Sequence, residues 1–290
     1  MFTGAMVALI TPFQDGQVDF ETLDELVGFQ LDSSIDGIVP VGTTGECPTL
    51  SHQEHKQVIE RVVKAAGGQT PVIAGAGSNS TAEAIELTAF AKKVGADATL
   101  QVTPYYNKPT QEGFYQHFKA IAEAVDLPMV LYNIPSRCGA GMTPDTIARL
   151  AEIENIVAIK EATGSLDQAS EIAMRCDMII ISGDDSLTLP LASVGAKGVI
   201  SVVANIVPTD VKAMTDLILV GDLVSARQWH NKLFTLCKSM LTLATNPIPI
   251  KAAMAMMDMA PEELRLPMTP LDTDKRAILR KTLLNYGLIE

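Results

Sequence analysis

Eight short apolar runs recur at regular intervals along most of the chain. They cover residues 6–10, 37–41, 71–74, 98–102, 128–132, 156–160, 178–182 and 198–202. Within each run the apolar residues are continuous and rich in β-branched types, which is typical of parallel strands buried on both faces. Successive runs begin 20 to 34 residues apart, so that every interval has room for one helix.

The intervals between these runs carry helix start signals. Ser51 with Glu54, and Ser80 with Glu83, match the capping-box pattern, in which two side chains satisfy the first free backbone N–H groups of a helix. Eight strand–helix units in succession predict a closed (β/α)8 TIM barrel of the α/β class. A doubly wound open sheet is the alternative, but the number and regularity of the units favour the barrel.

The strand signals stop beyond Pro208, and four further segments have helical periodicity. These segments are residues 210–220, 222–244, 250–259 and 273–286. We therefore expect residues 1–222 to form a catalytic barrel and residues 223–290 to form a small C-terminal helical domain.

Charge and cysteine content exclude several classes of function. The 290 residues include 22 Lys and Arg against 34 Asp and Glu, a formal net charge of −12, which disfavours nucleic acids and anionic membranes as partners. No signal peptide and no apolar run of about 20 residues is readable. The four cysteines, Cys47, Cys138, Cys176 and Cys237, form no C-x-x-C pair. We therefore expect reduced thiols and a cytoplasmic protein.

Lys160 is the strongest candidate for a catalytic residue, because it is the last residue of a strongly apolar run, where a barrel strand is expected to end. In a (β/α)8 barrel the active site lies at the carboxyl ends of the strands. Burial there favours the neutral amine, which can attack a carbonyl group to form a Schiff base. The alternative is a buried lysine that is paired with Glu161 or another carboxylate.

Residues at three other strand ends could support such chemistry. Tyr132, Tyr106 and Thr43 can carry protons, and Arg137 can bind a carboxylate through two hydrogen bonds. The glycines around Thr43 and Thr44 free backbone N–H groups that can also hold an anion. Each residue also has an ordinary interpretation, namely a packed aromatic ring for the tyrosines and a surface ion pair for Arg137.

Other polar patterns point to structure. His52 and His55 have the spacing of metal ligands, but no third ligand is evident, so exposed histidines are favoured and no metal is expected. Lys251 lies in the helical C-terminal part and is interpreted as structural. No complete dinucleotide-binding loop is present, so no nicotinamide cofactor is expected.

Three motifs resemble a known superfamily. GTTGE at 42–46, YNIP at 132–135 and IKEA at 159–162 are similar to the Schiff-base-forming superfamily of N-acetylneuraminate lyase. Further motifs resemble the dihydrodipicolinate synthase family within it. They are TPYYN at 103–107, PSR at 135–137, SGDD at 182–185, NPIPIK at 246–251 and RLPM at 265–268.

The resemblance implies a reaction. Pyruvate would form an imine with Lys160, and the derived enamine would attack L-aspartate 4-semialdehyde to give 4-hydroxy-tetrahydrodipicolinate, in diaminopimelate and lysine biosynthesis. The imine would replace any cofactor. A sister aldolase that cleaves a 2-keto sugar acid is the alternative, which Arg137 disfavours. A binding barrel without enzymatic activity is a third interpretation.

The resemblance also implies roles for individual residues. Tyr132 would be the proton donor and acceptor, and Thr43 would link it to Tyr106, which would reach the neighbouring subunit's site in a tight dimer within a homotetramer. The substrates would contact the side chains of Thr44 and Arg137 and the backbone of Gly183 and Ile200.

A second site follows only from the resemblance. L-Lysine would bind as an inhibitor at the dimer interface, through His52, His55, Asn79, Glu83 and Tyr105. The alternative is that Glu83 belongs to the capping box of Ser80 and that the histidines are merely exposed.

Overall fold

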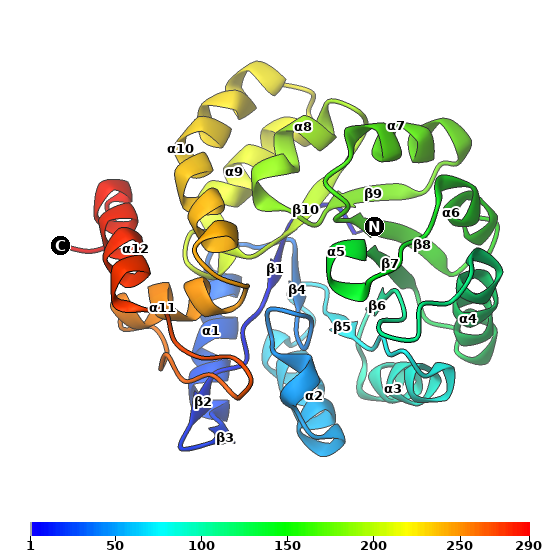
Figure 1. Cartoon of the computed structure of the whole chain (residues 1–290), viewed down its shortest axis with the longest axis horizontal. Coiled ribbons are helices and arrows are strands. Elements are labelled where there is room, and N and C mark those ends of the chain that lie inside the picture. The colour runs from blue at the N-terminus through cyan, green and yellow to red at the C-terminus, as the bar shows by residue number, and fades with distance from the viewer. Residues whose placement is uncertain (1) are drawn as a thin grey trace.

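The structure is a computed structural model that describes residues 2–290. Eight parallel strands form the centre of the fold and are surrounded by helices (Figure 1). The strands are β1 (Gly4–Ala8), β4 (Gly37–Val39), β5 (Ile73–Gly75), β6 (Ala98–Val102), β7 (Met129–Asn133), β8 (Ile156–Glu161), β9 (Ile179–Ser182) and β10 (Gly198–Ser201). Their spatial order is β4-β1-β10-β9-β8-β7-β6-β5.

The two ends of this sheet meet, so that the strands close into a barrel. A parallel bridge joins Ile38 of β4 to Val72, which precedes β5. The Ile38 N–H donates to the carbonyl of Pro71 over 2.9 Å, and the Gly75 N–H donates to the carbonyl of Pro40 over 3.0 Å. The predicted (β/α)8 barrel is therefore confirmed, and each of the eight apolar runs overlaps one strand.

Helices follow the barrel strands. They are α1 (Phe20–Asp32), α2 (His52–Ala66), α3 (Thr81–Val94), α4 (Gln111–Ala124), α5 (Pro135–Cys138), α6 (Pro144–Leu150), α7 (Leu166–Arg175), α8 (Thr188–Ala192) and α9 (Pro208–Leu219). Short 3₁₀ turns lie at η1 (Cys47–Thr49), η2 (Asp185–Leu187) and η3 (Val203–Asn205). The sequence analysis missed the hairpin of β2 (Phe13–Gln14) and β3 (Gln17–Val18), although its turn, Asp15-Gly16, is a recognised hairpin signal.

The cap at Ser51 is the predicted capping box. The Ser51 hydroxyl accepts from the Glu54 N–H, and Glu54 accepts from the Ser51 N–H over 2.8 Å. The second predicted box is only half formed, because Ser80 accepts from the Glu83 N–H but the Glu83 carboxylate turns to other partners. That carboxylate is therefore available to a site.

Three helices complete the chain, at α10 (Leu223–Thr242), α11 (Ile248–Met256) and α12 (Thr273–Tyr286). They lie on one side of the barrel (Figure 1), where α10 packs on α9 and η2, and α11 contacts η3. Buried side chains such as Leu236 and Ile250 belong to the same apolar cluster as residues of β1. The division of the chain between residues 222 and 223 stays a prediction.

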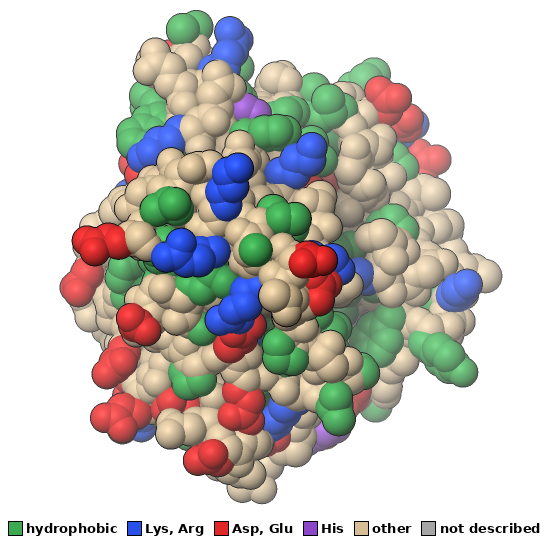
Figure 2. Space-filling view, turned by 60° about the vertical axis from the view of Figure 1, so that its left-hand side comes forward, with side chains coloured by type: hydrophobic (Ala, Val, Ile, Leu, Met, Phe, Trp, Pro, Cys, Tyr) green, Lys and Arg blue, Asp and Glu red, His purple; other side chains and the backbone are tan. Residues whose placement is uncertain are grey.

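The surface on the side of these helices mixes charged and apolar side chains (Figure 2). Lys and Arg side chains gather in the upper middle of this view, whereas Asp and Glu lie mostly lower and to the left. None of the helices within residues 2–290 is long and apolar enough to cross a membrane.

Candidate active site

Lys160 lies inside the barrel near the carboxyl end of β8 and is only 6% exposed. It is paired in register with Tyr132 of β7, and its Nζ lies 4.3 Å from the centre of the Tyr132 ring. Burial lowers the pKa of Lys160 to about 8, although the nearby Asp185 carboxylate acts in the opposite direction. About a tenth of this amine is therefore neutral at pH 7, far more than for an ordinary lysine.

The alternative pairing of Lys160 with Glu161 is not formed. Successive side chains of a strand point to opposite faces, so Glu161 faces away from the barrel interior. Its carboxylate accepts from the Thr163 N–H over 2.8 Å and from Gln168 Nε2 over 3.4 Å. Over the described part of the chain, Lys160 has no ion-pair partner within 4.0 Å, so its amine is free to react.

Tyr132 supplies a neutral phenol beside this amine. The ring is 4% exposed, and burial raises the pKa of Tyr132 to about 12, whereas the charge of Arg137 and the Thr43 hydroxyl act in the opposite direction. Tyr132 and Thr43 both line a small cavity of about 30 Å³ at the barrel mouth. A phenol of this kind can give and take a proton at a neighbouring imine without carrying a standing charge.

Tyr106 is the predicted relay residue that the chain does not bring to this cavity. It is 91% exposed, with a positive φ of 71°, and it is not among the residues that line the cavity. Within one chain, Thr43 and Tyr132 thus line the same cavity, whereas the Tyr106 side chain is exposed to solvent.

Thr44 and Arg137 are joined through Asn246, a residue that the sequence analysis quoted only as part of a motif. Asn246 Nδ2 donates to Thr44 Oγ1 over 3.0 Å, and Arg137 Nη2 donates to the main-chain carbonyl of Asn246 over 3.0 Å. Within residues 2–290 Arg137 forms no ion pair within 4.0 Å, so the guanidinium retains donors for an anion. The sequence offered one signal, the NPIP turn between two helices.

Gly183 lies beside Lys160, and Ile200 lies in the interior of the barrel. A Cβ atom at Gly183 would lie 2.6 Å from Cβ of Ala162 and 3.2 Å from Cε of Lys160, so only glycine allows this close approach. Ile200 of β10 is 1% exposed and packs in the interior cluster with Tyr132.

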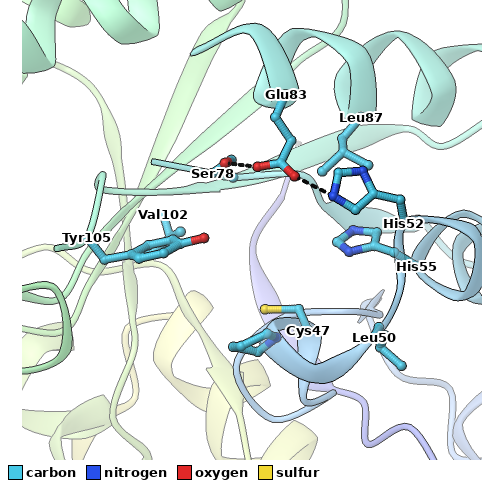
Figure 3. Close-up of a pocket in the computed structure, with 11 residues that line it drawn as sticks. Cys47, Leu50, His52, His55, Ser78, Glu83, Leu87, Val102 and Tyr105 are labelled. Carbon is cyan, nitrogen blue, oxygen red and sulfur yellow. Dashed lines mark hydrogen bonds and ion pairs between the residues drawn. The ribbon is translucent and has the colours of Figure 1, made fainter. Parts of the chain in front are cut away.

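The second predicted site forms a pocket of about 160 Å³ outside the barrel (Figure 3). His52, His55, Glu83 and Tyr105 line it, and Asn79 adjoins it, because Asn79 Nδ2 donates to the Tyr105 carbonyl over 3.1 Å. The rest of the lining, which lies outside the predicted set of ligands, is mainly small or apolar. These residues are Cys47, Pro48, Leu50, Gly77, Ser78, Leu87 and Val102.

Glu83 is the charged centre of this pocket. Its carboxylate accepts from the Ser78 hydroxyl and lies 2.8 Å from His52 Nε2 (Figure 3). The prediction of an exposed histidine is wrong for His55, which is 8% exposed and has its Nε2 2.7 Å from the Gly75 carbonyl. Burial lowers the pKa of His55, so this ring is a neutral wall of the pocket.

Lys251 has the structural setting that the sequence analysis expected. It is fully buried, forms an ion pair with Glu46 of the GTTGE motif, and donates to the Glu263 carbonyl over 2.9 Å. The described residues contain no group of three or more His, Cys, Asp and Glu side chains that could hold a metal ion.

Comparisons with known proteins agree with this geometry. A sequence profile of the dihydrodipicolinate synthetase family matches residues 1–285. A 4-hydroxy-tetrahydrodipicolinate synthase of Pelobacter propionicus is 56% identical over 291 residues, which cover 100% of both chains.

Two solved structures are similar over the same length. One is a dihydrodipicolinate synthase of Acinetobacter baumannii in complex with pyruvate, with a TM-score of 0.97 and 46% identity over 100% of both chains. The other, from Cyanidioschyzon merolae with lysine bound, has a TM-score of 0.95 and 42% identity over 99% of both chains.

Proposed function

This chain belongs to the dihydrodipicolinate synthetase family, and from that premise we propose that it condenses pyruvate with L-aspartate 4-semialdehyde to give 4-hydroxy-tetrahydrodipicolinate. This reaction belongs to diaminopimelate and lysine biosynthesis. The observation that carries the proposal is the buried, unpaired amine of Lys160 beside the neutral phenol of Tyr132.

Lys160 starts the reaction as a nucleophile. Its neutral Nζ attacks the keto carbon of pyruvate, the carbonyl oxygen leaves as water, and an imine remains. Loss of a proton from the pyruvate methyl group gives an enamine, whose carbon attacks the aldehyde carbon of the second substrate. The amine of that substrate then adds to the imine carbon, closes the ring and releases Lys160, so that one water is formed overall.

Tyr132 handles the protons of these steps. The phenol is held neutral by burial and lies over the amine, where it can protonate the departing oxygen and later take a proton back. Thr43, which lines the same cavity, is the next member of the relay. Because the imine itself activates the pyruvate carbon, we propose that the reaction needs no cofactor or metal.

The two substrate carboxylates have separate ligands in this proposal. Thr44 and the neighbouring backbone hold the carboxylate of pyruvate, and the free donors of Arg137 hold that of the semialdehyde. The backbone of Gly183 and Ile200 completes the walls.

Trapping of the imine tests this function. We expect pyruvate with borohydride to add to Lys160 the mass of pyruvic acid less one oxygen atom, and a coupled assay to show turnover with aspartate 4-semialdehyde. An adduct without turnover would favour the alternative aldolase acting on a 2-keto sugar acid. No adduct would contradict the enzyme and leave a binding barrel.

We further propose that two chains complete each other's active sites in a tight dimer, and that two such dimers form a homotetramer. The support is Tyr106, an aromatic side chain that is 91% exposed, has a left-handed backbone conformation and does not line the cavity of its own chain.

L-Lysine is the proposed effector of the outer pocket. The Glu83 carboxylate suits the ammonium groups of lysine, and the pocket has apolar walls for its methylene chain. The lysine-bound relative from Cyanidioschyzon merolae supports this choice.

A further inference from the structure

Asn246 connects the C-terminal helices to two loops of the barrel mouth. It lies in the turn between α10 and α11, is 7% exposed, and stands more than a hundred residues from either of its partners. Its side chain binds Thr44 in the loop after β4, and its main chain binds Arg137 in α5 after β7. One residue of the C-terminal part thus links both proposed carboxylate ligands.

The direction of the bond to Thr44 matters chemically. The amide nitrogen of Asn246 is a donor, so the Thr44 oxygen is the acceptor of that bond. The hydroxyl hydrogen of Thr44 therefore points elsewhere and can be donated to an anion. Because Thr44 is only 3% exposed, solvent does not compete freely for this donor.

The hydrogen bond to Arg137 leaves most of the N–H donors of that side chain free to bind an anion. A guanidinium group has five N–H donors, and the carbonyl of Asn246 engages one nitrogen, Nη2. This contact restricts the rotation of an otherwise exposed side chain, so less entropy is lost when a carboxylate binds.

We propose that Asn246 is a positioning residue that fixes the Thr44 hydroxyl as a donor toward the pyruvate carboxylate and holds Arg137 beside it. The proposal rests on the proposed function. It assigns the C-terminal helices a part in substrate binding, although their side chains need not touch the reacting atoms.

Asn246→Asp tests the direction of the bond, because it keeps the size of the side chain and replaces the donor by an acceptor. The Thr44 hydroxyl would then turn toward the new carboxylate and away from the substrate. We expect the KM for pyruvate to rise about tenfold, roughly the effect of one hydrogen bond to a charged group, while kcat changes less than about threefold. Asn231→Asp on the exposed face of α10 is the matched control and leaves both constants unchanged.

A double-mutant cycle separates positioning from a general structural role. Thr44→Val removes the hydroxyl that Asn246 is proposed to orient, so Asn246→Asp should raise KM by less than about twofold in that background. If Asn246→Asp does not fold, Asn246→Ser takes its place in the cycle. Additive effects, or a lowered melting temperature with an unchanged KM, would overturn the assignment.

The trapping experiment distinguishes this failure from that of the function. If wild-type protein forms the pyruvate adduct but the cycle is additive, only the role of Asn246 is refuted. If wild-type protein forms no adduct, the proposed function fails, and the positioning role fails with it.

Discussion

Lys160 and Tyr132 are register partners on adjacent parallel strands, and the amine of the first lies 4.3 Å from the ring centre of the second. The strand pairing fixes this distance, because both side chains project from the pleat into the barrel interior. Burial acts on the two groups in opposite directions, lowering the pKa of Lys160 to about 8 and raising that of Tyr132 to about 12. Burial thereby shifts both groups toward their neutral forms.

The pH dependence of imine formation follows from these values. Only the neutral amine attacks a carbonyl, so the initial rate of adduct formation should rise with pH and reach half its maximum near pH 8. Below that pH the rate should fall about tenfold per unit. Mass spectrometry of the adduct trapped with cyanoborohydride measures the profile. A rate that is independent of pH between about 6 and 9 would contradict the neutral nucleophile.

Gly183 should be intolerant of even one added methyl group. In Gly183→Ala the new Cβ would lie 2.6 Å from Cβ of Ala162, which is attached directly to the backbone just after β8, and 3.2 Å from Cε of Lys160. We expect a loss of about 1–3 kcal/mol in the free energy of unfolding, as for other overpacked sites, and at least about tenfold slower adduct formation.

Gly28→Ala is the matched control for that substitution. Gly28 lies in α1, and a Cβ there would meet nothing within 4 Å. Alanine in a helix should stabilise the fold by about 0.5–1 kcal/mol and leave adduct formation unchanged. Equal effects of the two substitutions in urea unfolding would show that the space around Gly183 is not limiting.

The buried ion pair of Lys251 and Glu46 should dominate the stability of the contact between the barrel and the C-terminal helices. Both side chains are at most 3% exposed, so Lys251→Met leaves an uncompensated buried carboxylate. We expect the free energy of unfolding to fall by about 3–5 kcal/mol. Adding Glu46→Gln should recover part of this loss, because the unpaired charge is removed.

Lys275→Met provides the comparison for this prediction. Lys275 pairs with Asp272 at 3.1 Å, but both side chains are about half exposed, so the loss should stay below about 1 kcal/mol. Urea unfolding of the wild type and the three variants measures the differences. A loss at Lys251 no larger than at Lys275 would be inconsistent with a stabilising buried pair.

Local patterns predicted the barrel and the position of Lys160 at the end of one of its strands. Continuous apolar runs fix the strands, and the polar residue that ends such a run, as Lys160 does, lies at the barrel mouth whatever the details of packing. The sequence did not predict the contact of Asn246 with Thr44, because 202 residues separate them and no local pattern encodes that pairing. The capping box that the sequence suggests for Ser80 and Glu83 forms only in part, because the Glu83 carboxylate contacts Ser78 and His52, which only tertiary structure brings near.

L-Lysine should stabilise the protein through the outer pocket. A ligand that binds only the folded state stabilises it, and at concentrations above Kd the added stability grows with the logarithm of the ligand concentration. The melting temperature should therefore rise with added lysine. Glu83→Gln removes the charge that faces the ammonium group and should abolish most of the rise. Glu86→Gln on the same helix, where Glu86 pairs with Lys56 at the surface, should leave it intact. An equal rise in both variants would contradict a role for Glu83.

Tyr106 should act in the site of the neighbouring chain. Tyr106→Phe homodimers should be slower by about tenfold to a hundredfold, and Lys160→Ala homodimers should be inactive. Dimers that contain one chain of each variant test whether the tyrosine acts across the interface. Such mixed dimers can be isolated after coexpression with two different affinity tags.

The two geometries predict different activities for the mixed dimer. Only the Tyr106→Phe chain retains Lys160, so the mixed dimer has one site with that lysine. If the Tyr106 side chain enters the neighbouring chain's site, this site receives an intact tyrosine from the Lys160→Ala chain. The dimer should then have about half the wild-type activity. If Tyr106 acts within its own chain, the site with Lys160 contains phenylalanine at position 106. The activity should then be about half that of the slow Tyr106→Phe homodimer. The second outcome, or failure of the two tagged chains to copurify, would contradict a shared active site. The first outcome would explain why so large an aromatic side chain is 91% exposed in a single chain.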